Sequence, residues 1–187
     1  MEITIRKATH QDREALCEIH VSSIRELGKS HYSEADVDAW SEGRTPARYE
    51  GHISERHVIV AQNRSVPVGF GTLDLTTGEI LQLYVRPEYV RKRIGTLILD
   101  ELLCVARAAG LREVNCISSL NARDFYVDAG FQPGQKCKHR FRNGGEVDCV
   151  PMKKLLERNN AELEDAIDGH SAGASYPQVI LVAVRRR

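Results

Sequence analysis

The chain of 187 residues is long enough to form one domain with a sizeable hydrophobic core. Its 26 basic and 26 acidic residues balance, so the overall charge gives no general attraction to nucleic acid or to an anionic membrane surface. No stretch approaches about eighteen consecutive apolar residues, and the N-terminus lacks an apolar signal segment, so we expect a cytoplasmic protein without a membrane span.

The first part of the sequence predicts a strand followed by two helices. Residues 2–8 alternate apolar and polar side chains, which is typical of a strand. Thr9 and Asp12 then form a capping-box pattern, and apolar side chains recur at helical spacing as far as Gly28. Ser33 and Asp36 repeat the capping pattern and predict a second, shorter helix.

The middle and end of the sequence predict the rest of a sheet. Residues 57–61 and 68–75 indicate an antiparallel hairpin, and residues 79–85 a central strand. An amphipathic helix then ends at Gly110 and leads to a strand at 113–118, so these two strands should be parallel with a right-handed crossover. Asn121 should cap a two-turn helix that ends at Gly130. A last hairpin is predicted from residues 136–142 and 147–152.

The cysteines point to reduced thiols rather than to a metal site or a disulfide framework. All five are widely spaced and form no C-x-x-C pair. Cys137, His139 and Cys149 match no standard zinc spacing. We therefore predict no metal.

The turn between the central strand and the following helix predicts an anion site. The apolar positions of the helix place its start close to residues 93–96, where the first N–H groups have no intrahelical acceptor and lie at the positive end of the helix dipole. Three basic residues, Arg91, Lys92 and Arg93, stand beside it. The sequence has neither G-x-x-x-x-G-K-[ST] nor a G-x-G-x-x-G after a strand, so a phosphate-bearing ligand is expected in a different setting.

Two motifs carry a resemblance to a known family. Residues 83–99 read L-Y-V-x-P-x-Y-x-x-x-x-I-G-T-x-(I/L)-L, and residues 121–131 read N-A-x-x-F-Y-x-x-x-G-F. In this order and separation they resemble the two cofactor motifs of the GNAT superfamily of acyl-CoA-dependent N-acyltransferases, over roughly residues 1–155. The resemblance implies an α/β (α+β) fold with a mixed, mostly antiparallel sheet of about seven strands, whose parallel strand-helix-strand centre is splayed to hold acyl-CoA.

The match departs from the family in the loop that binds the pyrophosphate. The family's (Q/R)-x-x-G-x-(G/A) falls on Val90, Arg93 and Gly95, so its first position and its first glycine are replaced. Main-chain amides need no particular side chain, but glycine often serves where the backbone takes a positive φ. Arg93 therefore either changes the shape of the loop or contacts a phosphate itself.

The resemblance implies acetyl-CoA as co-substrate and assigns its contacts. Main-chain groups of the central strand should pair with the pantetheine arm. The basic turn should hold the pyrophosphate, and one asparagine should also contact the cofactor. In chain order these residues are Leu83, Tyr84, Val85, Arg91, Lys92, Arg93, Ile94, Gly95, Thr96 and Asn121.

Acyl transfer to an amine needs a base more than an acid, because an alkyl ammonium has a pKa near 10.4 and a thiol one near 8.5. Glu79, which we expect to share a strand face with Leu81, Leu83 and Val85, matches a general base in some members of the family; the alternative is an exposed glutamate at a strand end. Tyr126 matches the family's general acid, and its alternative is a core tyrosine.

Tyr32 and Trp40 resemble residues that line the acceptor end of the cleft in one bacterial subgroup of the family. A hydrophobic anchor for a short helix is the alternative for Trp40. The resemblance implies an N-acetyltransferase that acts on a primary amine, either a small molecule or a peptide, by direct attack in a ternary complex. A non-catalytic acyl-CoA-binding regulatory module and a scaffold with a vestigial cleft remain the alternatives.

The predicted domain spans residues 1–157, followed by an extension at 158–187 of unknown role. Gly169 to Gly173 formally fits G-x-S-x-G, but the strand that should precede a nucleophile elbow is missing from the pattern. Val179 to Val184 is an added edge strand, a homodimer contact or an exposed segment, and the sequence does not decide among them.

Overall fold

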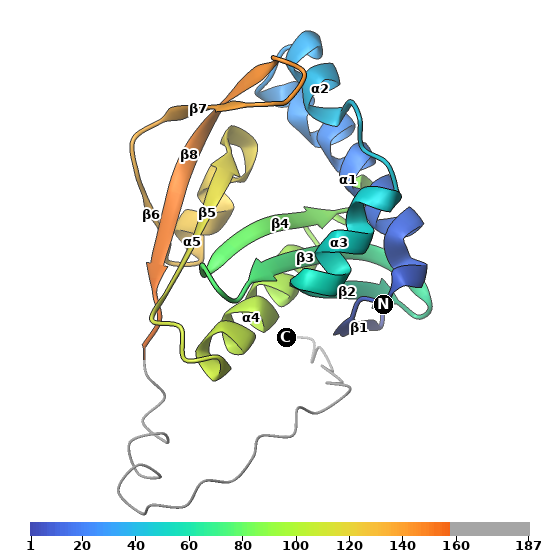
Figure 1. Cartoon of the computed structure of the whole chain (residues 1–187), viewed down its shortest axis with the longest axis vertical. Helices are drawn as coiled ribbons and strands as arrows, with labels where there is room; N and C mark the ends of the chain where they lie inside the picture. The colour runs from blue at the N-terminus through green and yellow to red at the C-terminus, as the bar shows by residue number, and fades with distance from the viewer. Residues whose placement is uncertain (158–187) are drawn as a thin grey trace, which may run out of the picture.

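The structure, a computed structural model, describes residues 1–157, which form one mixed sheet with helices on both faces (Figure 1). The sheet has eight strands in the order β1-β2-β3-β4-β5-β8-β6, and β7 pairs with β8. All paired neighbours are antiparallel except β4 and β5, which confirms the predicted fold class. The strands are β1 (Ile3–Lys7), β2 (His57–Asn63), β3 (Val66–Asp74), β4 (Glu79–Val85), β5 (Glu113–Ser119), β6 (Gln132–Pro133), β7 (Cys137–Arg140) and β8 (Glu146–Leu155).

The helices agree with the sequence patterns except in two places. Ser33 accepts a hydrogen bond from the Asp36 N–H, as predicted for the start of α2. Asn121 is not the predicted cap, because the chain makes a 3-10 turn over Leu120–Ala122 and α5 begins after it. Helix α3 was not predicted; Tyr49 is its one buried residue, and Ile53, four residues later, packs against the same cluster. The helices are α1 (Arg13–Leu27), α2 (Glu34–Ser41), α3 (Ala47–Glu55), α4 (Ile94–Ala108) and α5 (Arg123–Asp128).

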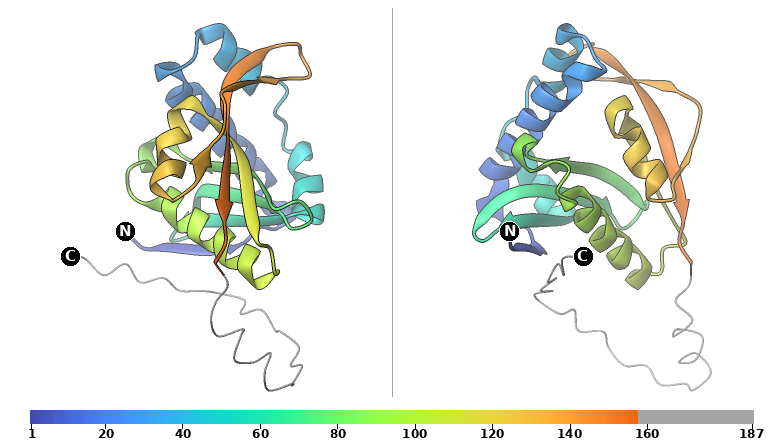
Figure 2. Two further views of the ribbon diagram at one scale, coloured as in Figure 1. Left: turned by 90° about the vertical axis from the view of Figure 1, so that its left-hand side faces the viewer. Right: turned by 180° about the vertical axis from the view of Figure 1, so that it is seen from behind.

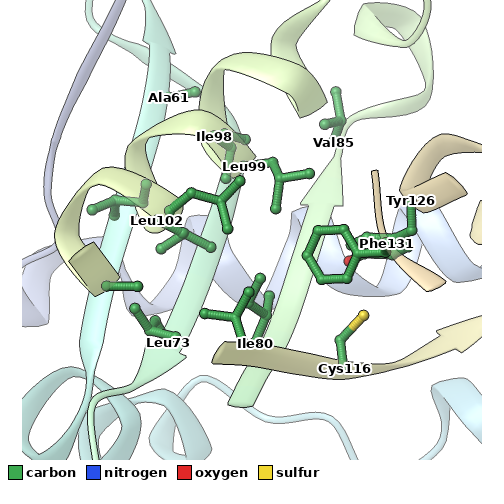
Figure 3. Packing of buried hydrophobic residues seen from close by; sticks show 14 of the residues in the cluster. Ala61, Leu73, Ile80, Val85, Ile98, Leu99, Leu102, Cys116, Tyr126 and Phe131 are labelled. Carbon is green, nitrogen blue, oxygen red and sulfur yellow. The ribbon is translucent and has the colours of Figure 1, made fainter. Parts of the chain in front are cut away.

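Two hydrophobic clusters lie on opposite faces of the sheet. The larger one joins α4 and α5 to the strands, and Figure 3 shows Ile98, Leu99 and Leu102 of α4 packed on it. The smaller one joins α1 and α3 to β2 and β3. A Cβ atom added to Gly69 or Gly71 of β3 would lie 2.9 or 2.6 Å from the Ile98 side chain. These glycines therefore allow α4 to approach the sheet closely.

The centre of the sheet is splayed. The parallel strands β4 and β5 share one paired position, Glu79 with Asn115, and diverge beyond it (Figures 1 and 2). The two ends of the sheet therefore lean apart. A gap between the main chains of β4 and β5 opens toward the C-terminal end of β4.

A β-bulge in β4 sets which side chains share a face. Thr72 pairs with Gln82 and Leu73 with Ile80, so Leu81 is an extra residue without a partner on β3. Ile80 and Val85 consequently lie in the same cluster beside α4, although alternation without a bulge would separate them. The prediction that Glu79 shares a face with Leu83 and Val85 is therefore wrong, because the bulge inverts the alternation between them.

No helix within residues 1–157 combines the length and the apolar character that a membrane crossing requires. The extension at 158–187, with the G-x-S-x-G match and the apolar stretch at 179–184, lies outside the described residues.

Candidate active site

The turn before α4 contains two arginines in the left-handed conformation, which glycine adopts most easily. Arg93 is the N-cap of α4 and adopts the left-handed conformation, with φ of 62° and ψ of 10°. Arg91 has a φ of 58°. A non-glycine residue in this conformation costs about 1–2 kcal/mol. The sequence thus maintains a strained loop rather than a relaxed one.

This loop presents a run of free main-chain donors. Within residues 1–157, the N–H groups of residues 91–96 make no hydrogen bond to the protein, whereas the N–H groups of Val90 and Leu97 on either side bond to Pro87 and Arg93 carbonyls. Consecutive free N–H groups at a helix N-terminus form an anion-binding site. Lys92 Nζ is tied back to the Glu88 carbonyl at 2.7 Å and lies 4.8 Å from the centre of the Tyr89 ring. The predicted pyrophosphate residues therefore lie together on one loop.

The gap between β4 and β5 leaves one side of β4 unpaired beside this loop. Leu83, Tyr84 and Val85 pair with Gly71, Phe70 and Gly69 of β3. On the other side, β5 has no paired position with β4 after Glu79 in the described chain. Main-chain groups on that side can therefore receive an extended ligand as an added strand would be received.

Tyr126 reaches the larger cluster from α5. Its side chain is 6% exposed and packs edge-on against Phe125 and Phe131 (Figure 3). The same cluster contains Val85 of β4 and Cys116 of β5, and the Cys116 thiol is a neighbour of the Tyr126 hydroxyl. Burial and the neighbouring Cys116 thiol hold the pKa of Tyr126 well above its usual value. The hydroxyl therefore keeps its proton at neutral pH and is a weaker acid than an exposed tyrosine.

A cavity of about 870 Å³ lies between β4, β5, the segment from α2 to α3, and the β7–β8 hairpin. Glu79 and Trp40 both line it. Tyr32 and Tyr126 are not among its lining residues. The structure thus brings two of the four predicted catalytic and acceptor residues into one cavity wall. Asn121 lies apart from it, exposed in the turn before α5.

Tyr32 does not line the cavity, and its hydroxyl makes two hydrogen bonds within the protein. The hydroxyl donates to the Asp148 carbonyl at 2.8 Å and accepts from the Leu120 N–H at 2.7 Å. Its ring packs edge-on against Trp40, with ring centres 5.5 Å apart. In this position Tyr32 joins the start of α2 to β8 and to the end of β5, and thereby supports the residues that face the cavity.

His20 is a cavity residue that the sequence patterns did not single out. Its side chain is 2% exposed, its Nδ1 lies 2.8 Å from the Tyr49 hydroxyl, and its ring stacks on Tyr84 with centres 3.9 Å apart. Burial, with a further contribution from Arg44 and Arg48, lowers the pKa of His20 well below 6.5. The buried Nε2 has no hydrogen-bond partner in residues 1–157. Its place on the apolar face of a helix, four residues after Leu16, is the one signal that the sequence offered.

Arginines from three separate segments also line the cavity. Arg44 follows α2, Arg48 belongs to α3, and Arg142 lies in the β7–β8 turn. None of them forms an ion pair in the described part of the chain. Burial and the charges of Arg44 and Arg142 lower the pKa of Arg48. Sequence reasoning missed this group because only the folded chain brings its members together.

Two cysteines face one another at the edge of the same cavity. Cys137 of β7 pairs directly with Cys149 of β8, and their Sγ atoms lie 2.9 Å apart as free thiols. Cys149 lines the cavity, and burial beside Cys137 raises its pKa to about 12. No group of three or more His, Cys, Asp or Glu side chains within residues 1–157 is arranged to hold a metal ion.

Comparisons with known proteins agree with this geometry. The family model of the acetyltransferase (GNAT) domain matches residues 29–156. A curated spermidine N(1)-acetyltransferase of Thermoplasma acidophilum is 27% identical over 126 residues, which are 60% of this chain and 76% of that protein.

Two solved structures show the same architecture. A GCN5-related N-acetyltransferase from Rhodopseudomonas palustris has a TM-score of 0.79 and 29% identity, covering 83% of this chain and 97% of the other. The PaiA N-acetyltransferase from Thermoplasma acidophilum, solved with coenzyme A, has a TM-score of 0.68 and 26% identity, covering 83% and 99%. With the free amide groups and the splayed sheet, these matches show that the chain belongs to the GNAT superfamily of acyl-CoA-dependent acetyltransferases.

Proposed function

We propose that the protein is a cytoplasmic N-acetyltransferase that transfers the acetyl group of acetyl-CoA to a primary amine by direct attack in a ternary complex. The observation that carries the proposal is that the loop with free N–H groups, the unpaired side of β4 and the cavity follow one another along the same strand. The free N–H groups of residues 91–96 lead to the unpaired side of β4, and β4 leads to the cavity that Glu79 lines. The acceptor is a small molecule or a peptide amine.

Binding of the cofactor divides between the loop and the strand. The pyrophosphate binds the N–H groups of residues 91–96, and the pantetheine arm extends along Leu83, Tyr84 and Val85. Asn121, at the turn between β5 and α5, adds a contact from the opposite side of the gap. Charged groups near the loop strengthen the interaction, but the main chain provides the geometry.

The reaction requires that a proton be removed from the acceptor ammonium and that a proton be delivered to the departing thiolate. Glu79 accepts a proton from the acceptor ammonium, directly or through water, because only the neutral amine attacks the thioester carbonyl. The new C–N bond forms and the C–S bond breaks, so the electron pair leaves with sulfur. Tyr126, whose hydroxyl is protonated at neutral pH, donates its proton to the departing thiolate as negative charge develops on sulfur.

The first test of this proposal is cofactor binding followed by turnover. A ligand at a hundred times its dissociation constant stabilises the folded state by about 2.7 kcal/mol, or on the order of 5–10 °C for a domain of this size. We expect such a shift with acetyl-CoA, and acetyl-CoA-dependent release of thiol when an amine acceptor is added. The absence of a shift at saturating acetyl-CoA would refute the proposal.

Tyr126→Phe separates an enzyme from a binding module that lacks turnover. The substitution removes only the hydroxyl and keeps the ring that fills the core, so acetyl-CoA should stabilise the variant as it stabilises the wild type. Turnover should fall about tenfold or more. This is a small effect for the loss of an acid catalyst, because a thiolate is a good leaving group even without protonation. A protein that binds acetyl-CoA and acetylates no amine would be a regulatory module instead.

A further inference from the structure

We propose that the amine acceptor carries an anionic group, a carboxylate or a phosphate, and that this group binds among Arg44, Arg48 and Arg142, with His20 beside them. The inference rests on the proposed function, because it names the class of acceptor for that reaction. It also runs against the simplest reading of the similarity to a spermidine acetyltransferase, since spermidine is a polycation.

The charges that line the cavity are arranged for a ligand with two unlike ends. Asp148 on the wall is occupied by Lys136 at 2.6 Å and Lys138 at 3.0 Å, and Glu42 accepts a hydrogen bond from Asn143 at 2.7 Å. Glu42 keeps its charge, because Asn143 is neutral, and Glu79 has no side-chain hydrogen bond or ion pair within residues 1–157. The cavity therefore offers the carboxylate of Glu79, which has no partner in the described chain, to an ammonium group.

Positively charged side chains line the cavity from other segments of the chain. Arg44 follows α2, Arg48 lies in α3 and Arg142 lies in the β7–β8 turn. Glu79, by contrast, begins β4. Because these guanidinium groups have no ion pair in residues 1–157, they repel one another, and a second ammonium group on the ligand would add to the repulsion. A carboxylate or a phosphate relieves it and can accept paired hydrogen bonds from an arginine.

His20 gives a second and independent indication of a ligand. Its buried Nε2 has no partner in the described chain, and a buried polar atom without a partner is destabilising unless a ligand or water satisfies it. When the Tyr49 hydroxyl donates to Nδ1, the imidazole proton lies on Nε2. A neutral His20 in this tautomer can then donate a hydrogen bond to an oxygen of the anionic group.

The test uses amines that match in length and differ in charge. The probes are 4-aminobutanoate, 1-butylamine and 1,4-diaminobutane, whose far ends are negative, neutral and positive. A second pair, O-phosphoethanolamine and 2-aminoethanol, tests phosphate against hydroxyl. Binding of each probe is measured by calorimetry on the full chain saturated with coenzyme A.

We expect at least one anionic amine to bind about tenfold or more tightly than its neutral counterpart, and diaminobutane to bind weakest. Arg142→Gln lies in an exposed turn and should fold normally, and it should remove most of this preference. Arg48→Gln should have a similar effect. Arg107→Gln on α4 removes the same charge outside the cavity and should change nothing. If 4-aminobutanoate gains more affinity over its neutral counterpart than O-phosphoethanolamine does, the recognised group is a carboxylate. The reverse result identifies a phosphate.

Equal or tighter binding of butylamine or diaminobutane would overturn the inference, and so would failure of every probe to bind at millimolar concentration. Turnover measured in parallel keeps the two proposals separate. Acetylation of the neutral and dicationic amines without an anionic preference would refute the inference and leave the acetyltransferase standing. An anionic preference in binding without any acetyl transfer would support the recognition and refute the proposed function.

Discussion

The two sides of the site are built from different parts of the chain. On the proposed cofactor side, the N–H groups of residues 91–96 and the unpaired side of β4 are main-chain groups from one continuous segment. On the proposed acceptor side, the cavity is lined by side chains such as His20, Arg48 and Arg142, which come from distant segments. A site made of main chain tolerates changes of side chain, whereas a site made of side chains changes its ligand with each substitution.

Arg93 illustrates the tolerance of the cofactor side. It stands where the family motif has glycine and adopts the left-handed conformation that glycine tolerates best, so the loop keeps its amides free at a cost in stability. The four predictions below test the contrast, in order of decreasing expected effect.

Glu79→Gln should cause the largest loss of activity among these substitutions. It removes the proposed base while keeping size and hydrogen bonding, so kcat at neutral pH should fall by about a hundredfold or more. The rate deficit should shrink at higher pH as more of the amine is neutral in solution. Acetyl-CoA affinity should not change, because the proposed cofactor contacts lie at residues 83–85 and 91–96.

Glu113→Gln is a matched control for that substitution. Glu113 begins β5 as Glu79 begins β4, and it pairs with Lys153 outside the cavity. Its replacement should leave kcat within about twofold, since surface ion pairs contribute little. A similar loss in both variants, measured by steady-state kinetics, would contradict the assignment of Glu79.

His20 should make the folded state sensitive to mild acid. Its pKa in the folded protein lies well below 6.5, so the unfolded chain binds the proton first as the pH falls through 6.5. Stability is therefore complete above that pH and decreases below it, by up to about 1.4 kcal/mol at one pH unit lower. Urea unfolding at several pH values measures the slope. His52 and His57, whose pKa values burial also lowers, add to it.

A double variant isolates the part of this slope that belongs to His20. His20→Phe with Tyr49→Phe removes both partners of their hydrogen bond and keeps aromatic packing against Tyr84, so neither partner is left unsatisfied. Its stability should depend less steeply on pH between about 5.5 and 7.5. An unchanged slope would show that the titration of His20 does not destabilise the fold.

Arg91→Ala should weaken acetyl-CoA binding only about three- to tenfold, because the exposed guanidinium adds charge while the amides remain. Lys92→Ala should have a smaller effect, since Lys92 Nζ is already bonded to the Glu88 carbonyl. Calorimetric dissociation constants should converge at high salt, where exposed charges are screened. A loss beyond a hundredfold would mean that side chains hold the phosphates.

Arg93→Gly should be more stable than Arg93→Ala by about 1 kcal/mol in denaturant unfolding, because both lose the charge and only glycine relaxes at positive φ. Arg64, in the turn between β2 and β3, also has a φ of 58° and provides the comparison. The same pair of substitutions there should differ in stability by a similar amount without changing acetyl-CoA affinity. Equal stability of Arg93→Gly and Arg93→Ala would show that the loop is not strained.

The contrast between a site built from one continuous segment and a site built from distant segments also explains which features could be predicted from the sequence. Residues 79–110 carry strand, turn and helix patterns locally, so the anion loop and the parallel β4–α4–β5 unit were predictable. The bulge at Leu81 was not, because one inserted residue leaves no local pattern and yet reverses which side chains share a face with Glu79. Similarly, nothing near Tyr32 indicates that its hydroxyl bonds to Asp148 and Leu120, both far along the chain.

The splay between β4 and β5 has a consequence for how the protein unfolds. With one paired position at its centre, the sheet consists of two halves joined by little main-chain bonding, so each half can open locally without the other. The extended cofactor arm that we propose to bond to β4 and to contact the β5 side would restore continuity across the break. Amide hydrogen exchange should accordingly slow together in β3–β4 and in β5–β8 when acetyl-CoA binds, which would make two cooperative folding units behave as one.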